Sequence, residues 1–115
     1  MLPGQMTMRD GHEKGEIWWA ELEKPLGRRP VLLLSRDESY RIRDSVIVAQ
    51  ITTKIRHITT EIYLDEKDGM PKKCVVNLDN LMTIKKFILR ERICNVSAHK
   101  MVLAEQALKF ALALR

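Results

Sequence analysis

The sequence has few cysteines and no long apolar run. Its 115 residues include two cysteines, Cys74 and Cys94, which form no CxxC pair. This favours neither a disulfide scaffold nor a zinc site, and we expect two buried thiols in a reducing compartment. No apolar stretch approaches the roughly 20 residues that a membrane helix needs, and the polar N-terminus lacks a secretory-signal pattern. These absences predict a cytoplasmic protein with no membrane partner.

The common metal and nucleotide motifs are missing as well. His12, His57 and His99 share no ligand spacing, and no HExxH pattern occurs, so we expect no metal site and no cofactor. The chain has neither a Walker A loop nor a GxGxxG turn, and no GxSxG motif supports a serine nucleophile. Any chemistry therefore has to come from Arg, Thr, Ser and Asp side chains.

The composition is that of a small globular protein with a basic surface. Hydrophobic residues make up 45% of the chain and charged residues 30%, which is typical of a folded domain. The length predicts one domain with a modest core. The formal net charge of +5 favours a polyanionic partner such as nucleic acid, although basic proteins without that role are common.

The order of the predicted elements indicates a mainly β fold. We expect a flexible leader over residues 1–14 and a single domain over residues 15–115. Alternation and apolar runs predict strands at 15–22, 31–35, 46–51, 60–64, 74–78, 81–84 and 92–96. Ser97 is a good N-cap for a helix over residues 98–114. Short strands followed by one helix predict a small antiparallel barrel that the helix closes or flanks.

Three local patterns refine this prediction. Trp18 and Trp19 are adjacent in a strand and so lie on opposite faces, which makes one a core residue and the other part of an interface, a covered surface or a stacking platform. The continuous apolar run of residues 31–35 indicates a strand buried on both sides. The wide apolar arc of the C-terminal helix predicts two contact surfaces, namely its own sheet and a partner chain.

The stretch Arg28-Arg29-Pro30 is the strongest candidate for chemistry. Pro30 biases Arg29 towards an extended backbone, and Thr52 and Thr53 end the third predicted strand. If these strands are neighbours, an Arg fork and a Thr hydroxyl converge on one phosphate, where they stabilise a phosphorane. RNA brings its own nucleophile, the 2′-hydroxyl, so neither a metal nor a protein nucleophile is needed. Ordinary surface roles for these residues remain the alternative.

Four stretches, taken together, resemble a known family. They are residues 15–22, 29–35, 46–53 and 78–84, and a C-terminal helix follows them. In order and spacing they are similar to the MazF/PemK-type toxins of bacterial toxin–antitoxin pairs. The resemblance implies an SH3-like antiparallel β-barrel of the CcdB/PemK type with a C-terminal helix, and a homodimer. It also implies metal-independent, sequence-specific cleavage of single-stranded RNA and inhibition by a cognate antitoxin in the RNA groove.

The resemblance also implies roles for individual residues. Arg29 matches the catalytic Arg that supports the phosphate and shuttles a proton, and Thr52 matches the Thr that stabilises the transition state. Because a free Arg has a pKa far above neutrality, we expect electrostatic stabilisation to be the main role of Arg29. Asp79 matches a residue that some relatives use as general base. Further candidates for RNA contact are Arg28, Thr53 and Trp19.

Some positions depart from the family pattern, and a second function is open. The loop 24–28 is shorter than in many relatives, Met82 stands where several carry Arg, and Asn80 stands where Gln is common. These positions bear on base recognition and cleavage efficiency. The alternative function is a non-catalytic RNA- or protein-binding module, either a degenerate toxin or a gyrase-poison-like barrel. The gyrase poisons often use a Trp in the C-terminal helix, which this helix lacks.

Overall fold

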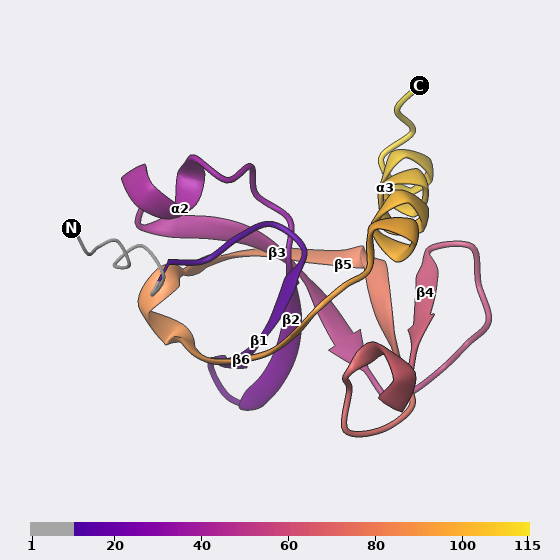
Figure 1. Cartoon of the computed structure of the whole chain (residues 1–115), viewed down its shortest axis with the longest axis horizontal. Helices are drawn as coiled ribbons and strands as arrows, with labels where there is room; N and C mark the ends of the chain where they lie inside the picture. Colours follow the sequence, from indigo (N-terminus) through magenta and orange to yellow (C-terminus); the bar gives the residue numbers. More distant parts are fainter. Residues whose placement is uncertain (1–10) are drawn as a thin grey trace.

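The computed structural model describes residues 11–115 and shows one antiparallel sheet with a C-terminal helix (Figure 1). The order of the strands in the sheet is β4-β5-β3-β2-β1-β6. The strands are β1 (Glu16–Glu21), β2 (Arg28–Leu33), β3 (Ser45–Thr52), β4 (Glu61–Leu64), β5 (Cys74–Lys85) and β6 (Leu89–Asn95). The helical elements are α2 (Ser39–Ile42), η1 (Glu66–Asp68), η2 (Lys86–Ile88) and α3 (Ala98–Ala111).

The sheet curls into an open half-barrel, so its two sides bury two different apolar clusters. The inner core lies within the curl and consists of Ala20, Leu22, Val31, Leu33, Tyr40, Val46, Val48, Ile84 and Leu89. The helix-side core lies on the other side, where α3 covers β4 and β5 (Figure 1). It consists of Ile17, Leu32, Ala49, Ile51, Leu64, Met70, Cys74, Val76, Leu78, Ala104 and Ala107. The predicted mainly β fold with a curled antiparallel sheet and a C-terminal helix is confirmed.

Strand β2 connects the two cores. Val31, Leu32 and Leu33 are all fully buried. Successive side chains of a strand point to opposite faces, and both faces of the sheet are covered here. Val31 and Leu33 enter the inner core, whereas Leu32 enters the helix-side core. The predicted burial of this strand on both sides is therefore confirmed. Each such side chain contributes roughly 1.5–3 kcal/mol to folding, so the strand that carries Arg29 is firmly held.

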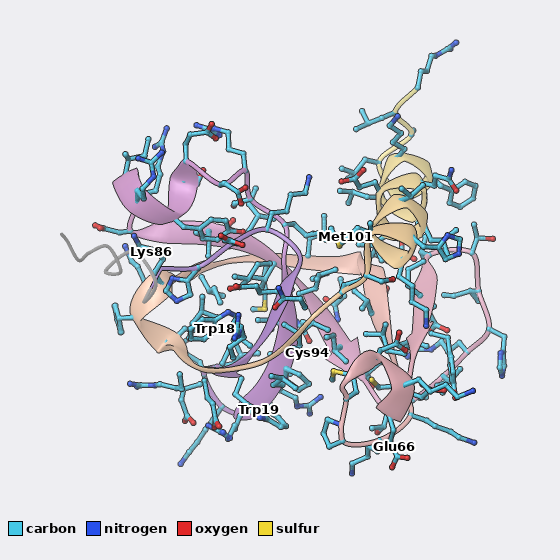
Figure 2. All side chains as sticks on the ribbon, viewed as in Figure 1. Trp18, Trp19, Glu66, Lys86, Cys94 and Met101 are labelled. Atoms are coloured by element: carbon cyan, nitrogen blue, oxygen red, sulfur yellow. The ribbon has the colours of Figure 1, made fainter. Side chains whose placement is uncertain are left out.

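The two tryptophans of β1 separate as the alternation predicts. Trp18 packs against the inner core, and its Nε1–H donates to the buried carboxylate of Glu16 at 2.9 Å. The ring of His12 lies on it, with the centroids 4.3 Å apart. Trp19 points away from the curl, as Figure 2 shows. Trp18 is therefore the core residue, and Trp19 is the one left for another surface.

The segment of residues 74–85 differs from its prediction. We expected two strands separated by a bend at Asp79–Asn80, but these residues form one strand, β5. Its pairing with β3 skips from Asn77 to Leu81, and the Asn77 side chain accepts a hydrogen bond from the backbone N–H of Asp79 at 2.9 Å. The predicted bend is thus a bulge, which exposes Asp79 and Asn80 while Leu78 stays buried in the helix-side core, and the strand does not end there.

Smaller differences concern the ends of elements and the connection after β2. The predicted connection over residues 36–44 contains the short helix α2. The predicted N-cap is confirmed, because Ser97 Oγ accepts from the backbone N–H of Lys100 at 3.2 Å. The helix then ends at Ala111, and Ala113 has a positive φ of 57°, which is incompatible with a continuing helix.

Most of the predicted leader, residues 1–14, lies outside the described residues. Lys14 already contacts the domain, since its backbone N–H donates to Asp37 at 2.8 Å and its ammonium lies 3.2 Å from Glu105. The division of the chain at residue 14 stays a prediction. None of the helices within residues 11–115 is long and apolar enough to cross a membrane.

Candidate active site

The pairing of β2 with β3 brings the two main candidates together. The strands are antiparallel, and Val31 pairs with Gln50. Continuing this register by two residues in each strand places Arg29 beside Thr52, at the edge where β2 begins and β3 ends. The condition on which the phosphate-site hypothesis depended, that these two strands are neighbours, is therefore met.

Arg29 and Thr52 line a pocket of about 300 Å³. The strand side of the pocket is formed by Trp19, Arg29, Pro30, Ile51, Thr52 and Thr53. The remaining lining residues come from the start of β5 and the segment before it: Met70, Pro71, Lys72 and Cys74. Among residues 11–115, the lining contains two cations and two hydroxyls but no Asp or Glu. Its apolar walls and uncompensated positive charge suit a planar base joined to a phosphate.

The guanidinium of Arg29 is oriented by the backbone and has no counter-ion among the described residues. Its Nε–H donates to the carbonyl oxygen of Leu26 at 3.0 Å, which fixes one edge of the fork. Within residues 11–115 no carboxylate forms an ion pair with it. The two Nη groups therefore remain available for a bidentate contact with an anion, the geometry in which Arg binds phosphate best.

The hydroxyl of Thr52 is arranged as a donor. Its Oγ1 accepts a hydrogen bond from the backbone N–H of Lys54 at 3.1 Å. Because a hydroxyl has one hydrogen and two lone pairs, the hydrogen of Thr52 is still free to donate to an oxygen in the pocket. Thr53 also lines the pocket and is exposed.

Arg28 and Arg29 have different surroundings although they are adjacent. Arg28 lies outside the pocket lining, with its Cζ 4.8 Å from the centroid of the Trp19 ring. It also forms ion pairs with Glu21 at 3.6 Å and Glu91 at 3.4 Å. These pairs are exposed and contribute little to stability. They do compete with any anion for Arg28, so Arg29 is the better phosphate-binding candidate.

Asp79 and Met82 lie away from the pocket lining. The Asp79 carboxylate accepts a 2.6 Å hydrogen bond from the buried Thr60 hydroxyl at the bulge of β5. Met82 packs against the inner core, and its sulfur accepts from Gln50 Nε2 at 3.2 Å. The structure therefore brings together Arg29, Thr52, Thr53 and Trp19 but not Asp79.

Cys74 lines the pocket although the sequence did not suggest it as a site residue. Burial, and secondarily its neighbour Cys94, raise the pKa of the Cys74 thiol to about 11. The thiol is therefore neutral at physiological pH and is a poor nucleophile. Both cysteines are free, and Cys74 is buried as expected, whereas Cys94 is only partly buried. No group of three or more His, Cys, Asp or Glu side chains placed to hold a metal ion occurs in the described part of the chain.

Comparison with known proteins agrees with this geometry. Residues 13–112 match the family model described as PemK-like, MazF-like toxin of type II toxin–antitoxin system. The chain is 37% identical over 81 residues to the probable endoribonuclease MazF5 of Mycobacterium tuberculosis, covering 70% of this chain and 73% of that protein.

Two solved structures show the same fold. The Mycobacterium tuberculosis toxin MazF-mt6 superposes with a TM-score of 0.80 at 32% identity, covering 87% of this chain and 98% of that one. An endoribonuclease in complex with its cognate antitoxin, from a mycobacterial species, superposes with a TM-score of 0.80 at 26% identity, covering 90% and 97%. This chain belongs to the PemK/MazF family of toxins of type II toxin–antitoxin systems.

Proposed function

We propose that the protein is the toxin of a toxin–antitoxin pair and an endoribonuclease that cuts single-stranded RNA at specific sequences without a metal ion. The observation that carries the proposal is that Arg29 and Thr52 line one pocket, and that no acid of the described residues lines it with them. Family membership supports it, since the matched relatives are named endoribonucleases. The single barrel domain of residues 15–115 is the catalytic unit.

The proposed reaction uses groups on both molecules. The 2′-hydroxyl of the RNA attacks the adjacent phosphorus, the bond to the 5′-oxygen breaks, and a 2′,3′-cyclic phosphate and a 5′-hydroxyl result. The proton lost by the 2′-oxygen is balanced by the proton gained by the leaving oxygen. Arg29 contacts the non-bridging oxygens and Thr52 donates to one of them, so both bind the charge that grows in the transition state.

The pocket also supports an assignment for the flanking residues. Trp19 offers a flat aromatic surface beside the phosphate position, and base–aromatic stacking contributes about 1–3 kcal/mol per base. Arg28, which already lies on this ring, would move aside or join the stack. Thr53 is a second hydroxyl near the backbone of the RNA. Asp79 remains a candidate general base that would have to act from outside the pocket lining.

The test is cleavage of a mixed RNA pool by the purified full chain with EDTA present. We expect Arg29→Ala and Thr52→Ala each to lower the rate about 10²–10³-fold, the usual effect of removing one transition-state donor. Arg36→Ala and Thr59→Ala are matched controls, because both residues are exposed and lie outside the pocket lining. Equal cleavage rates for the wild type and both pocket variants would show that this pocket is not the active site. Cleavage that depends on added metal would contradict the proposed mechanism.

Two partners and a location complete the proposal. A cognate antitoxin is supported by the relative solved in complex with one. A homodimer is supported by the exposed apolar side chains of α3 and its C-cap, since Val102, Phe110 and the C-cap residue Leu112 are each more than half exposed. The cytoplasm is the place where such a toxin meets messenger RNA. Light scattering tests the dimer, since a mass near 13.4 kDa would show a monomer.

A further inference from the structure

One wall of the pocket comes from a part of the chain that the family motifs quoted above do not include. Residues 69–73 connect η1 to β5, and three of them, Met70, Pro71 and Lys72, line the pocket. No acidic side chain of the described residues lines it with them. A wall built by a loop serves binding only if the loop is held in place. The contacts of this loop show that it is.

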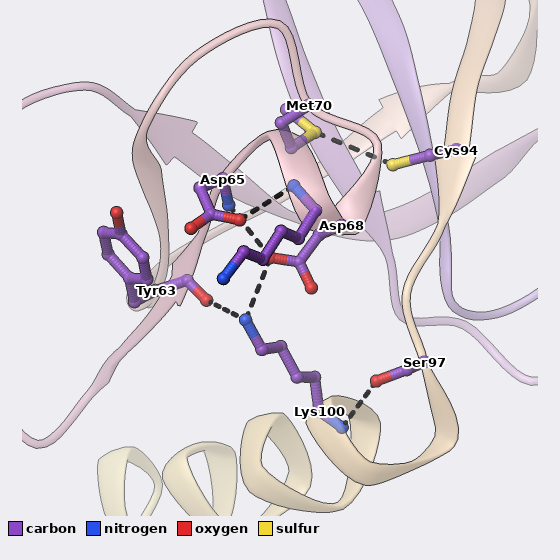
Figure 3. A network of polar contacts seen from close by, with 8 residues as sticks. Tyr63, Asp65, Asp68, Met70, Cys94, Ser97 and Lys100 are labelled. Carbon is purple, nitrogen blue, oxygen red and sulfur yellow. Dashed lines mark hydrogen bonds and ion pairs between the residues drawn. The ribbon is translucent and has the colours of Figure 1, made fainter.

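The helix α3 anchors the loop from one side, as Figure 3 shows. The ammonium of Lys100 lies 2.9 Å from the Asp68 carboxylate and 2.8 Å from the carbonyl oxygen of Tyr63. Asp68 and Asp65 cap η1 reciprocally, each side chain accepting a hydrogen bond from the backbone of that turn. The Asp68–Lys100 pair is mostly shielded from solvent, with 15% and 26% of the side chains exposed.

Close packing holds the next two residues. Gly69 has a φ of 99°, and a Cβ placed there would lie 2.7 Å from the Cβ of Cys94. Only glycine fits this contact without displacing β6. Met70 follows with its side chain 4% exposed and its sulfur 3.7 Å from the Cys94 thiol. The chain is thus fixed immediately before Pro71 and Lys72 reach the pocket.

Lys72 has no partner within residues 11–115, although other nearby cations do. Lys100 and Arg28 are engaged by carboxylates, whereas no ion pair or hydrogen bond involves the Lys72 ammonium. Lys72 also lines a second hollow, together with Asp65, Glu66, Lys67 and Lys73. The pocket with Arg29 contains no acid, so the two cations that line it both lack a counter-ion there.

We propose that Lys72 is an RNA-binding residue that contacts a phosphate next to the one held by Arg29, with Met70 and Pro71 forming the apolar wall against the intervening nucleoside. The inference rests on the proposed function and extends it. RNA carries one negative charge per nucleotide, so two unpaired cations on one pocket match two consecutive phosphates. Lysine suits the flanking position because it binds phosphate as a point charge without a fixed orientation.

The test compares Lys72→Gln with Lys73→Gln in the full chain. Lys73 is the matched control, because it is the neighbouring exposed lysine and lines the second hollow but not the pocket with Arg29. The probe is a pool of 2′-O-methyl RNA oligonucleotides, which cannot supply the nucleophile, titrated at several salt concentrations. We expect Lys72→Gln to weaken binding about tenfold at low salt, to lower the salt slope by about 0.7, and to be rescued by Lys72→Arg.

The outcomes separate this inference from the proposed function. An unchanged salt slope in Lys72→Gln, or equal losses in the two lysine variants, would overturn the role of Lys72 while leaving cleavage by the wild type intact. Absence of cleavage by the wild type would overturn the proposed function, and the binding titration would still decide on Lys72. Unfolding midpoints equal to that of the wild type show that a binding loss in a variant is not a folding defect.

Discussion

The inner core and the helix-side core lie on opposite sides of one sheet, and they relate differently to the pocket. No residue of the inner core lines it, whereas Ile51, Met70 and Cys74 belong to both the helix-side core and the pocket lining. We therefore expect substitutions in the inner core to change the stability of the fold with little effect on the pocket. In the helix-side core, the same side chains contribute to stability and to the pocket that we propose binds RNA.

This difference explains why the helix matters to the site although it contributes no lining residue. Helix α3 covers the helix-side core with Ala104 and Ala107 and fixes the loop before β5 through Lys100. We therefore expect a change in α3 to alter the wall of the pocket through these contacts. The inner core, by contrast, contributes to the position of Arg29 by burying Val31 and Leu33 of the same strand, β2.

The largest effect is expected from truncating each core in turn. Leu33→Ala removes a fully buried inner-core side chain, and Ile51→Ala removes one that is 2% exposed and lines the pocket. Each should lower the free energy of unfolding by about 2–5 kcal/mol, measured by urea denaturation. We expect RNA cleavage per folded molecule to fall only in Ile51→Ala. Equal cleavage in both variants would show that the pocket is insensitive to its core.

A smaller effect is expected from two glycines with positive φ. Gly69→Ala places a Cβ 2.7 Å from Cys94, whereas Gly27→Ala, at a φ of 67°, meets nothing within 4 Å. Gly27→Ala should cost about 1–2 kcal/mol from backbone strain alone. Gly69→Ala should cost about 1–3 kcal/mol more, because overpacking is added. If both variants lost the same stability in thermal unfolding, the loop around Gly69 would accommodate the added Cβ without cost. The loop would then not be the rigid pocket wall that we propose.

The sequence predicted the elements that depend on local pattern. The two-sided burial of Val31, Leu32 and Leu33, the opposite faces of Trp18 and Trp19, and the Ser97 cap follow from spacing and side-chain chemistry alone. The sequence also singled out Arg29 and Thr52 as candidates, but whether they line one pocket depended on which strands are neighbours. That is a property of the sheet order, which local pattern does not encode.

The loop wall could not be predicted for the same reason. Lys72 looks like any exposed lysine after a Gly-Met-Pro turn, and its place at the pocket results from three contacts distant in sequence. These are the bond of Lys100 to Asp68, the contact of Gly69 with Cys94, and the pairing of β4 with β5. Likewise, the bulge at Asp79 looked like a break between strands, because only the partner strand shows that pairing resumes.

The smallest effect concerns the anchor between α3 and the loop. Burial alone would raise the pKa of the Asp68 carboxyl, but the hydrogen bond from the Asp65 backbone and the hydrogen bond and charge of Lys100 outweigh it and hold that pKa below its ordinary value of 3.8. A carboxyl with a lowered pKa in the folded state stabilises the fold above its unfolded pKa, and this contribution is lost as the pH falls through the folded pKa. We therefore expect Asp68→Asn to lower the free energy of unfolding by about 1 kcal/mol at neutral pH.

The pH dependence distinguishes this anchor from a general effect of charge. The difference in stability between wild type and Asp68→Asn should be constant from neutral pH down to about pH 5 and should shrink as the pH falls below about 4. The exposed Glu66, on the same turn and without an ion pair among the described residues, provides the control Glu66→Gln, which should match the wild type throughout. A difference for Asp68→Asn that persists undiminished in acid would show that the side chain acts through packing. The ion pair between α3 and the loop would then not be what couples the helix-side core to the pocket.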